Sequence, residues 1–107
     1  MGVVSRIRRS DVYWLNLDPT VGTEINKTRP ALVVSPDDMN DALPSVLIAP
    51  ITSAGQPLGC RPELKLKGKA ARILLDQIRS VDKAHLGTKL GSVALSVWHP
   101  VLLEMLS

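Results

Sequence analysis

The stretch Thr28-Arg29-Pro30-Ala31-Leu32-Val33-Val34-Ser35-Pro36 decides how this chain folds. Residues 31–35 form an apolar run closed by a proline, a pattern typical of a strand buried on both faces. Pro30 restricts Arg29 to extended backbone, so the strand starts on a stiffened main chain. The stretch therefore predicts a core strand with a cation held at its beginning.

Prolines and glycines divide the rest of the chain into short elements. We expect further strands at residues 12–17, 46–51, 63–66 and 72–81, and a short last strand at 93–95. Residues 36–42 have room for one helical turn. Apolar residues at i, i+4 and i+8 predict a C-terminal helix over 97–106, which would put Pro100 near its first helical position. Short strands with so little helix indicate a mainly β protein, a small β-barrel.

Composition is that of a globular domain. The chain has 107 residues, 45% of them hydrophobic and 21% charged, which are ordinary values. This length predicts a single domain spanning residues 1–107. The lone cysteine, Cys60, excludes an intrachain disulfide and a thiolate-built metal site. The net charge of +3 is mild, so it favours a polyanionic partner only slightly over a merely basic surface.

The ends and the apolar runs carry no targeting signal. The arginines near the start are not followed by the apolar segment that an export signal needs. The longest apolar runs fall far short of the ~20 residues that span a bilayer. We therefore expect a cytoplasmic protein with no membrane contact.

Three linked blocks carry a family resemblance. They are Asp18-Pro19-Thr20-Val21-Gly22-Thr23-Glu24 with the stretch at 28–36, Ala49-Pro50-Ile51-Thr52-Ser53, and Leu75-Asp76-Gln77-Ile78-Arg79-Ser80-Val81-Asp82. In this order and spacing they resemble the MazF/PemK family, the ribonuclease toxins of type II toxin–antitoxin modules, over about residues 9–89. The resemblance implies an SH3-like barrel, a strongly curved antiparallel sheet with a C-terminal helix of CcdB/MazF type.

The same resemblance implies how such a protein works. It implies a homodimer that cuts single-stranded RNA at short sequences, without a metal or another cofactor. It also implies a cognate antitoxin whose flexible acidic tail covers the RNA site. None of these properties follows from composition or periodicity.

The resemblance assigns the catalytic pair to Arg29 and Thr52. Metal-free cleavage uses the ribose 2′-OH as nucleophile and needs donors for the charged phosphorane. A guanidinium suits this role because it can hold two phosphate oxygens at once. Strand alternation puts Thr52 on the same face as Ile48 and Pro50, at the end of its strand.

Glu24, in the loop before Arg29, could act as base, orient Arg29 or bind a base edge. We favour orientation or substrate contact, and the proton-transfer roles stay open.

Other residues of the motif blocks are candidate RNA contacts. They are Lys27, Thr28, Ser53, Asp76, Gln77 and Arg79. Read as a strand, 76–79 alternates, so Gln77 and Arg79 point one way and Asp76 the other, where it could instead brace the barrel. The basic cluster Arg61, Lys65, Lys67, Lys69 and Arg72 could track RNA phosphates, but we expect it to be mainly a solvated hairpin face.

Several residue types suggest no chemistry of their own. Tyr13, Trp14 and Trp98 lie in elements expected to form the core, which favours packing over stacking on RNA. His85, His99 and Cys60 do not have metal-ligand spacing, so no metal site is expected.

Two alternatives to the ribonuclease stay open. One is a non-enzymatic toxin like CcdB, which binds DNA gyrase through its C-terminal tip. The other is an inactive relative that only binds an antitoxin. Arg29 and Thr52 in their motif context favour the ribonuclease over both.

Overall fold

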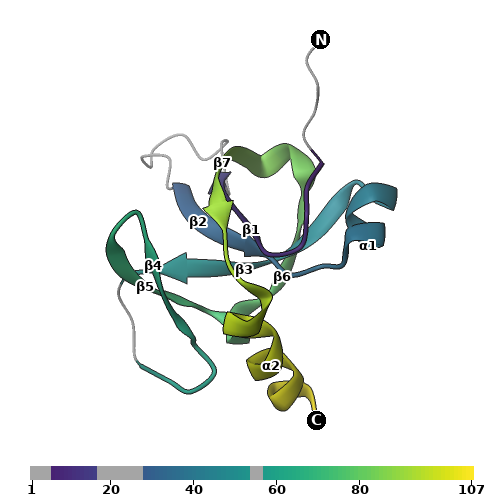
Figure 1. Ribbon diagram of the computed structural model, residues 1–107. Coiled ribbons are helices and arrows are strands. Elements are labelled where there is room, and N and C mark those ends of the chain that lie inside the picture. The colour runs from purple at the N-terminus through teal and green to yellow at the C-terminus, as the bar shows by residue number, and fades with distance from the viewer. Residues whose placement is uncertain (1–5, 17–27, 54–56) are drawn as a thin grey trace.

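A computed structural model describes residues 6–16, 28–53 and 57–107. Its strands form an antiparallel sheet in the order β4-β5-β3-β2-β1-β7, with β6 also paired to β3 (Figure 1). The strands are β1 (Asp11–Asn16), β2 (Thr28–Val33), β3 (Ser45–Thr52), β4 (Glu63–Leu66), β5 (Lys69–Ile73), β6 (Arg79–Asp82) and β7 (Leu86–Ser92). The α-helices are α1 (Asp37–Ala42) and α2 (Leu95–Leu106), and the 3-10 turns are η1 (Leu75–Gln77) and η2 (Lys83–His85).

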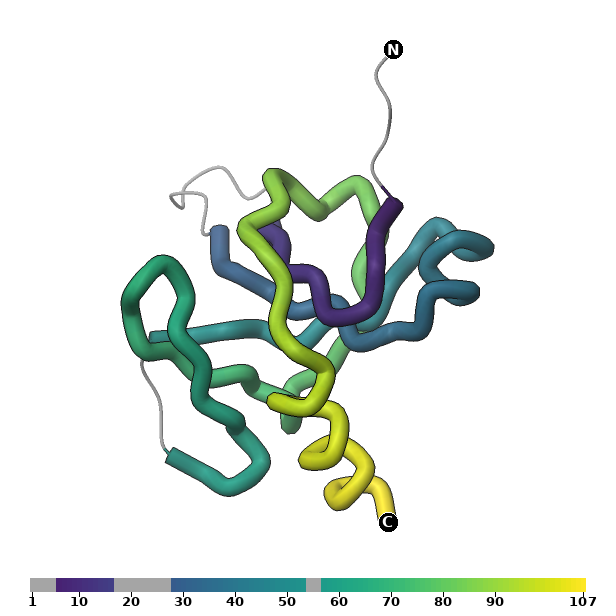
Figure 2. Tube along the Cα trace, viewed as in Figure 1, coloured from purple at the N-terminus to yellow at the C-terminus, as the bar shows by residue number. Residues whose placement is uncertain are grey.

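Strand β3 is the centre of the sheet because it pairs along both of its edges. One edge pairs with β2, and the other is shared by β6 and β5. Strand β6 pairs with the first half of β3, where Ile48 lies opposite Arg79. Strand β5 pairs with the end, where Thr52 lies opposite Arg72. Two partners along one edge curl the sheet into a half-barrel, as Figure 2 shows. The predicted curved antiparallel sheet is confirmed.

Alternation along the strands divides the core into two clusters on opposite faces. On the face that we call the helix face, Leu32, Ala49 and Ile51 pack with the buried Trp98 of α2. On the opposite face, Ala31, Val33 and Ile48 pack with side chains of β1 and β6. Residues 31–33 are completely buried, which confirms the strand buried on both faces.

Trp98 anchors α2 to the sheet. Its side chain is fully buried, and its indole Nε1 donates a 2.8 Å hydrogen bond to Ser10 Oγ. The guanidinium of Arg9 lies 5.4 Å from the centre of its ring, within the range of a cation–π contact. Trp98 is therefore a core residue, as the sequence predicted.

The expected strand over 72–81 is wrong. Strand β5 ends at Ile73, the chain makes the turn η1, and β6 begins only at Arg79. Leu74 leaves the extended conformation, with φ −87° and ψ 75°, and starts the 3-10 turn that interrupts the strand. The alternation that we expected over 76–79 is therefore wrong as well.

Two further expectations near the C-terminus are wrong. The last strand is β7, which ends at Ser92 before the predicted residues 93–95. Helix α2 begins at Leu95, so Pro100 lies inside the helix instead of near its start. Pro100 is exposed, where its ring meets solvent instead of the core.

Candidate functional site

Arg29 and Thr52 lie at the adjoining ends of β2 and β3. The register sets Ala31 opposite Pro50 and Val33 opposite Ile48. The same register, continued outward from Ala31 and Pro50, brings Arg29 opposite Thr52. Side chains of directly opposed residues share a face. Arg29 is exposed and Thr52 is half-buried, so the two residues predicted to be catalytic can meet one ligand from neighbouring strands.

Two further arginines lie on the same face as Arg29 and Thr52. Arg72 is directly opposite Thr52, and Arg79 is opposite Ile48, which shares its face with Thr52. We call Arg29, Thr52, Arg72 and Arg79 the arginine face. Arg72 Nη2 lies 3.4 Å from Glu63 Oε2, whereas Arg29 and Arg79 form no ion pair with any acidic side chain that the structure describes. Guanidinium groups in this arrangement suit phosphate oxygens.

Arg79 is among the candidate RNA contacts that the sequence predicted, whereas Arg72 is not. Arg72 was expected in the mainly solvated hairpin cluster, because the sequence does not show which strand pairs with the end of β3 beside Thr52. The pairing of β5 with the end of β3 brings it there. The neighbours of Arg72 in the chain, Ala71 and Ile73, are buried. This alternation is the feature of the sequence that could have indicated the direction of the Arg72 side chain.

Asp76 has its carboxylate occupied by Arg61. Arg61 Nε donates to Asp76 Oδ1 at 3.0 Å, and Arg61 Nη2 donates to Oδ2 at 3.0 Å. These hydrogen bonds lower the pKa of Asp76 below its ordinary value. The pair connects the segment before β4 to η1. The contacts of Asp76 therefore fit the bracing role, one of the two roles that the sequence left open for it.

The remaining predicted contacts are distributed around the strand ends. Ser53 is exposed directly after Thr52, and Gln77 is exposed at the end of η1. Thr28 begins β2 opposite Asn16, and alternation directs it to the face away from Arg29. Glu24 and Lys27 lie outside the described residues.

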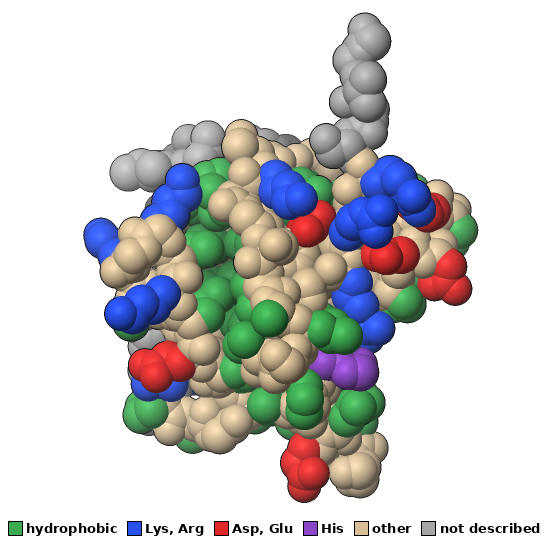
Figure 3. Space-filling model, viewed as in Figure 1, with side chains coloured by type: hydrophobic (Ala, Val, Ile, Leu, Met, Phe, Trp, Pro, Cys, Tyr) green, Lys and Arg blue, Asp and Glu red, His purple; other side chains and the backbone are tan. Residues whose placement is uncertain are grey.

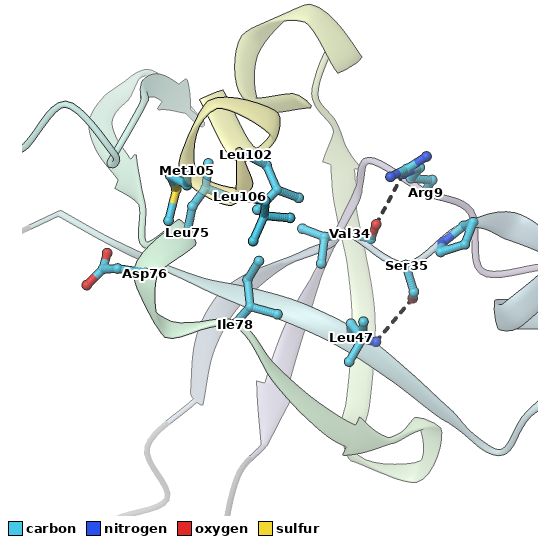
Figure 4. Close-up of a pocket in the computed structure, with 11 residues that line it drawn as sticks. Arg9, Val34, Ser35, Leu47, Leu75, Asp76, Ile78, Leu102, Met105 and Leu106 are labelled. Carbon is cyan, nitrogen blue, oxygen red and sulfur yellow. Dashed lines mark hydrogen bonds between the residues drawn. The ribbon is translucent and has the colours of Figure 1, made fainter. Parts of the chain in front are cut away.

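An apolar hollow of about 450 Å³ lies beside α2, on the helix face of the sheet (Figure 4). Val34, Leu47 and Ile78 of the sheet side face Leu102 and Leu106 of the helix across it. Leu103 and Leu106 of α2 are 54% and 74% exposed. This end of the molecule therefore presents apolar surface that the described chain leaves uncovered.

The described residues contain neither a metal-binding cluster nor a membrane-spanning helix. Within residues 6–16, 28–53 and 57–107, no three His, Cys, Asp or Glu side chains come together as a metal ion would require. No helix in this part of the chain is long and apolar enough to cross a membrane.

The chain is similar to a set of known toxins. A family model described as a PemK-like, MazF-like toxin of type II toxin–antitoxin systems matches residues 8–104. Endoribonuclease EndoA of Bacillus subtilis (strain 168) is 34% identical over 90 residues, covering 78% of both chains. Endoribonuclease MazF of Staphylococcus epidermidis is also 34% identical over 90 residues, covering 78% of this chain and 75% of its own.

Solved structures share the fold. A chain of the MazE-MazF (Form-II) crystal structure from Deinococcus radiodurans matches with a TM-score of 0.81 and 27% identity, covering 96% of this chain and 97% of its own. The MazF (Form-I) structure from the same organism has a TM-score of 0.76 and 27% identity, covering 96% and 98%.

Proposed function

Because the chain belongs to the family of PemK-like, MazF-like toxins of type II toxin–antitoxin systems, we propose that it is a sequence-specific endoribonuclease. Its substrate is single-stranded RNA, cut at short sequences without a metal ion. The observation that carries the proposal is the β2–β3 register, which pairs Ala31 with Pro50 and, when extended by two residues along both strands, sets Arg29 across from Thr52. The names of two relatives, both endoribonucleases, support it.

The proposed reaction is an internal transfer within the RNA. The 2′-oxygen of the ribose loses its proton and bonds to phosphorus, while the bond from phosphorus to the 5′-oxygen breaks and that oxygen gains a proton. The products are a 2′,3′-cyclic phosphate and a free 5′-OH. The Arg29 guanidinium donates to the phosphate oxygens as charge builds up, and the Thr52 hydroxyl donates one further hydrogen bond. Glu24 orients Arg29 or contacts the substrate.

Neighbouring residues hold the RNA in this proposal. Arg79 contacts a phosphate, since its guanidinium is exposed on the same face as Arg29. Lys27, Thr28, Ser53 and Gln77 contact nucleotides beside the cut. Asp76 acts through Arg61 by holding η1, because its carboxylate already accepts two hydrogen bonds.

We also propose that the toxin is a homodimer with a cognate antitoxin. The uncovered apolar surface of α2 and the hollow beside it support self-association. Light scattering at micromolar concentration is expected to give the mass of two chains, and a monomer mass would contradict this.

An antitoxin with a flexible acidic tail fits the arginine face by charge, so its binding is expected to weaken with added salt. The proposed setting is the cytoplasm, with residues 1–107 acting as one domain.

The decisive experiment combines EDTA with a modified substrate. A long single-stranded RNA is digested in EDTA, and the new 5′ ends are mapped to obtain the cut sequence. An oligonucleotide with this sequence and a 2′-deoxy sugar at the cut position is expected to bind nearly as well and to resist cleavage. A strict Mg²⁺ requirement, or normal cutting of the deoxy substrate, would overturn the mechanism. Incubation with DNA gyrase is the matched control, since a CcdB-like toxin would act there and leave RNA intact.

A further inference from the structure

We propose that a second hollow, beside Trp14, binds one nucleobase of the RNA next to the cut, by stacking on the exposed indole. This inference rests on the proposed ribonuclease function and adds to it a residue that contributes to substrate binding. The hollow lies on the helix face, behind the strand ends that bear Arg29 and Thr52.

The hollow has a volume of about 250 Å³ and mostly apolar walls. Trp14 and Pro30, which are directly opposite each other on β1 and β2, form one wall. Ile51, Leu66, Ala70 and Ala71 form the remainder. Figure 3 shows apolar side chains gathered between the β4–β5 hairpin and β7, with Lys and Arg side chains on the hairpin beside them.

Trp14 is open to this space although its neighbours in β1 are buried. Its side chain is 36% exposed, against 6% for Tyr13 and 1% for Leu15. Alternation puts Trp14 on the same face as Val12, but of the two only Val12 belongs to the buried cluster that contains Trp98 of α2. Gly87 of β7 has no side chain to cover the indole, and a Cβ there would lie 3.5 Å from Trp14 Cβ. The sequence prediction that Trp14 belongs to the core is therefore wrong.

The polar rim of the hollow connects it to the proposed catalytic pair. Ser53 and the exposed Lys69 line its rim together with Thr52, whose side chain is directed to the arginine face. Pro30, in the wall, directly follows Arg29 in the chain. The slot and the arginine face thus meet at the ends of β2 and β3, and an RNA strand with a phosphate between Arg29 and Thr52 would pass around these ends to place an adjacent base in the slot.

A nucleobase is the ligand that this combination favours. Unpaired RNA bases stack on aromatic side chains, and their edges accept and donate hydrogen bonds to groups such as hydroxyls. Apolar walls on both sides suit the faces of a base, whereas a phosphate or an acidic peptide would require more cations than Lys69, which is at the rim. Stacking acts on the bound substrate as a whole, so it should change KM more than kcat.

The first test uses the difference between the two tryptophans. Trp98 is fully buried and Trp14 is not, so an oligonucleotide carrying the mapped cut site with a 2′-deoxy sugar should quench only Trp14 fluorescence. The quenching is expected to disappear in Trp14→Phe, which still stacks and folds. No quenching by RNA, quenching that persists in Trp14→Phe, or a response seen only with an acidic peptide would overturn the inference.

The second test compares Trp14→Phe with Trp14→Leu, which keeps apolar cover but removes the aromatic face. Trp14→Leu is expected to raise KM about tenfold to a hundredfold, the range for loss of one stacked base, with Trp14→Phe near the wild type. Substrates that lack one base at each position in turn should show one position where Trp14→Leu costs nothing more. Equal losses at every position would mean that Trp14 is only structural.

The two proposals fail in different ways. If the wild type does not cut RNA at all, the proposed function fails. If the wild type cuts RNA and Arg29→Ala does not, while Trp14→Leu has the wild-type KM, only the stacking slot fails.

Discussion

At the scale of single residues, the positions of Arg29 and Thr52 at the ends of β2 and β3 set what these side chains can do. Both side chains lie where their strands end, on backbone held by fully buried neighbours such as Ala31, and Ile51 is only 2% exposed. Neither side chain is part of either apolar cluster. A change at either residue should therefore affect the chemistry and leave the fold intact.

We expect Arg29→Ala to lower kcat by ~10²–10³, the usual cost of losing one donor to a developing oxyanion, or more because this donor is charged. Thr52→Ala should be comparably or somewhat less damaging. Thr52→Ser, which keeps the hydroxyl, is the matched control and should retain most activity. Single-turnover cleavage measures the rates, and thermal unfolding checks that the midpoint stays near that of the wild type. Full activity in Arg29→Ala would remove Arg29 from the site.

At the scale of elements, helix α2 combines a strong anchor with a local defect. Trp98 fixes it to the sheet through its burial and its hydrogen bond to Ser10. Pro100, two residues later, has no N–H to donate to the carbonyl of Ser96. The anchor therefore holds in place a helix that the sequence by itself would begin later.

We expect Pro100→Ala to stabilise the protein. The substitution restores one helical hydrogen bond and removes a residue that costs up to about 3 kcal/mol relative to alanine in a helix interior. Urea unfolding at one fixed protein concentration measures the gain. Pro36→Ala is the matched control, because Pro36 precedes α1 at its N-cap and not inside it. An unchanged or lower free energy of unfolding in Pro100→Ala would mean that its ring contributes contacts, for example between two chains.

At the scale of the whole molecule, the proposed function predicts that the cations of the arginine face act together on RNA. Each phosphate that a cation neutralises releases counterions, so affinity for single-stranded RNA falls with salt, with a slope in log units of about −0.7 per phosphate. Arg79→Ala should weaken binding for all sequences and make this slope shallower by about one phosphate contact. Lys83→Ala, on the turn η2, is a control that should change the slope little. Equal slopes in Arg79→Ala and the wild type would exclude a phosphate contact at Arg79.

Acid stability is a further property of the whole molecule. Because Arg61 lowers the pKa of Asp76 in the folded state, the ion pair stabilises the fold above the unfolded pKa, and this contribution is lost as pH falls through the lower folded value. The difference in free energy of unfolding between the wild type and Asp76→Asn should thus be constant above about pH 5 and shrink below about pH 4. Unfolding curves between pH 3 and pH 7 measure it, with the exposed Glu104→Gln as control. A difference that grows in acid would contradict the assignment.

Elements that depend on neighbours close in the sequence could be predicted, whereas elements that depend on distant segments could not. The apolar runs of β2 and β3 were predictable because burial on both faces leaves a continuous hydrophobic pattern, and Pro36 and Gly59 mark local breaks. Strand β7 was missed because its sequence, LGTKLGS, is polar and rich in glycine. It is a strand because β1 offers it a free edge, which no local pattern reveals.

The sequence by itself determined the core strands, the motif residues and the positions of Arg29 and Thr52 at strand ends, because alternation, proline geometry and apolar burial act between near neighbours. Only the tertiary structure decided that Arg72 joins the arginine face, that Asp76 is held by Arg61, and that Trp14 is exposed. Each of these depends on which distant segment lies alongside: β5 on the end of β3, Arg61 on η1, and α2 covering one end of the helix face and not the other. Such pairings depend on the packing of the whole chain, and local sequence carries little record of them.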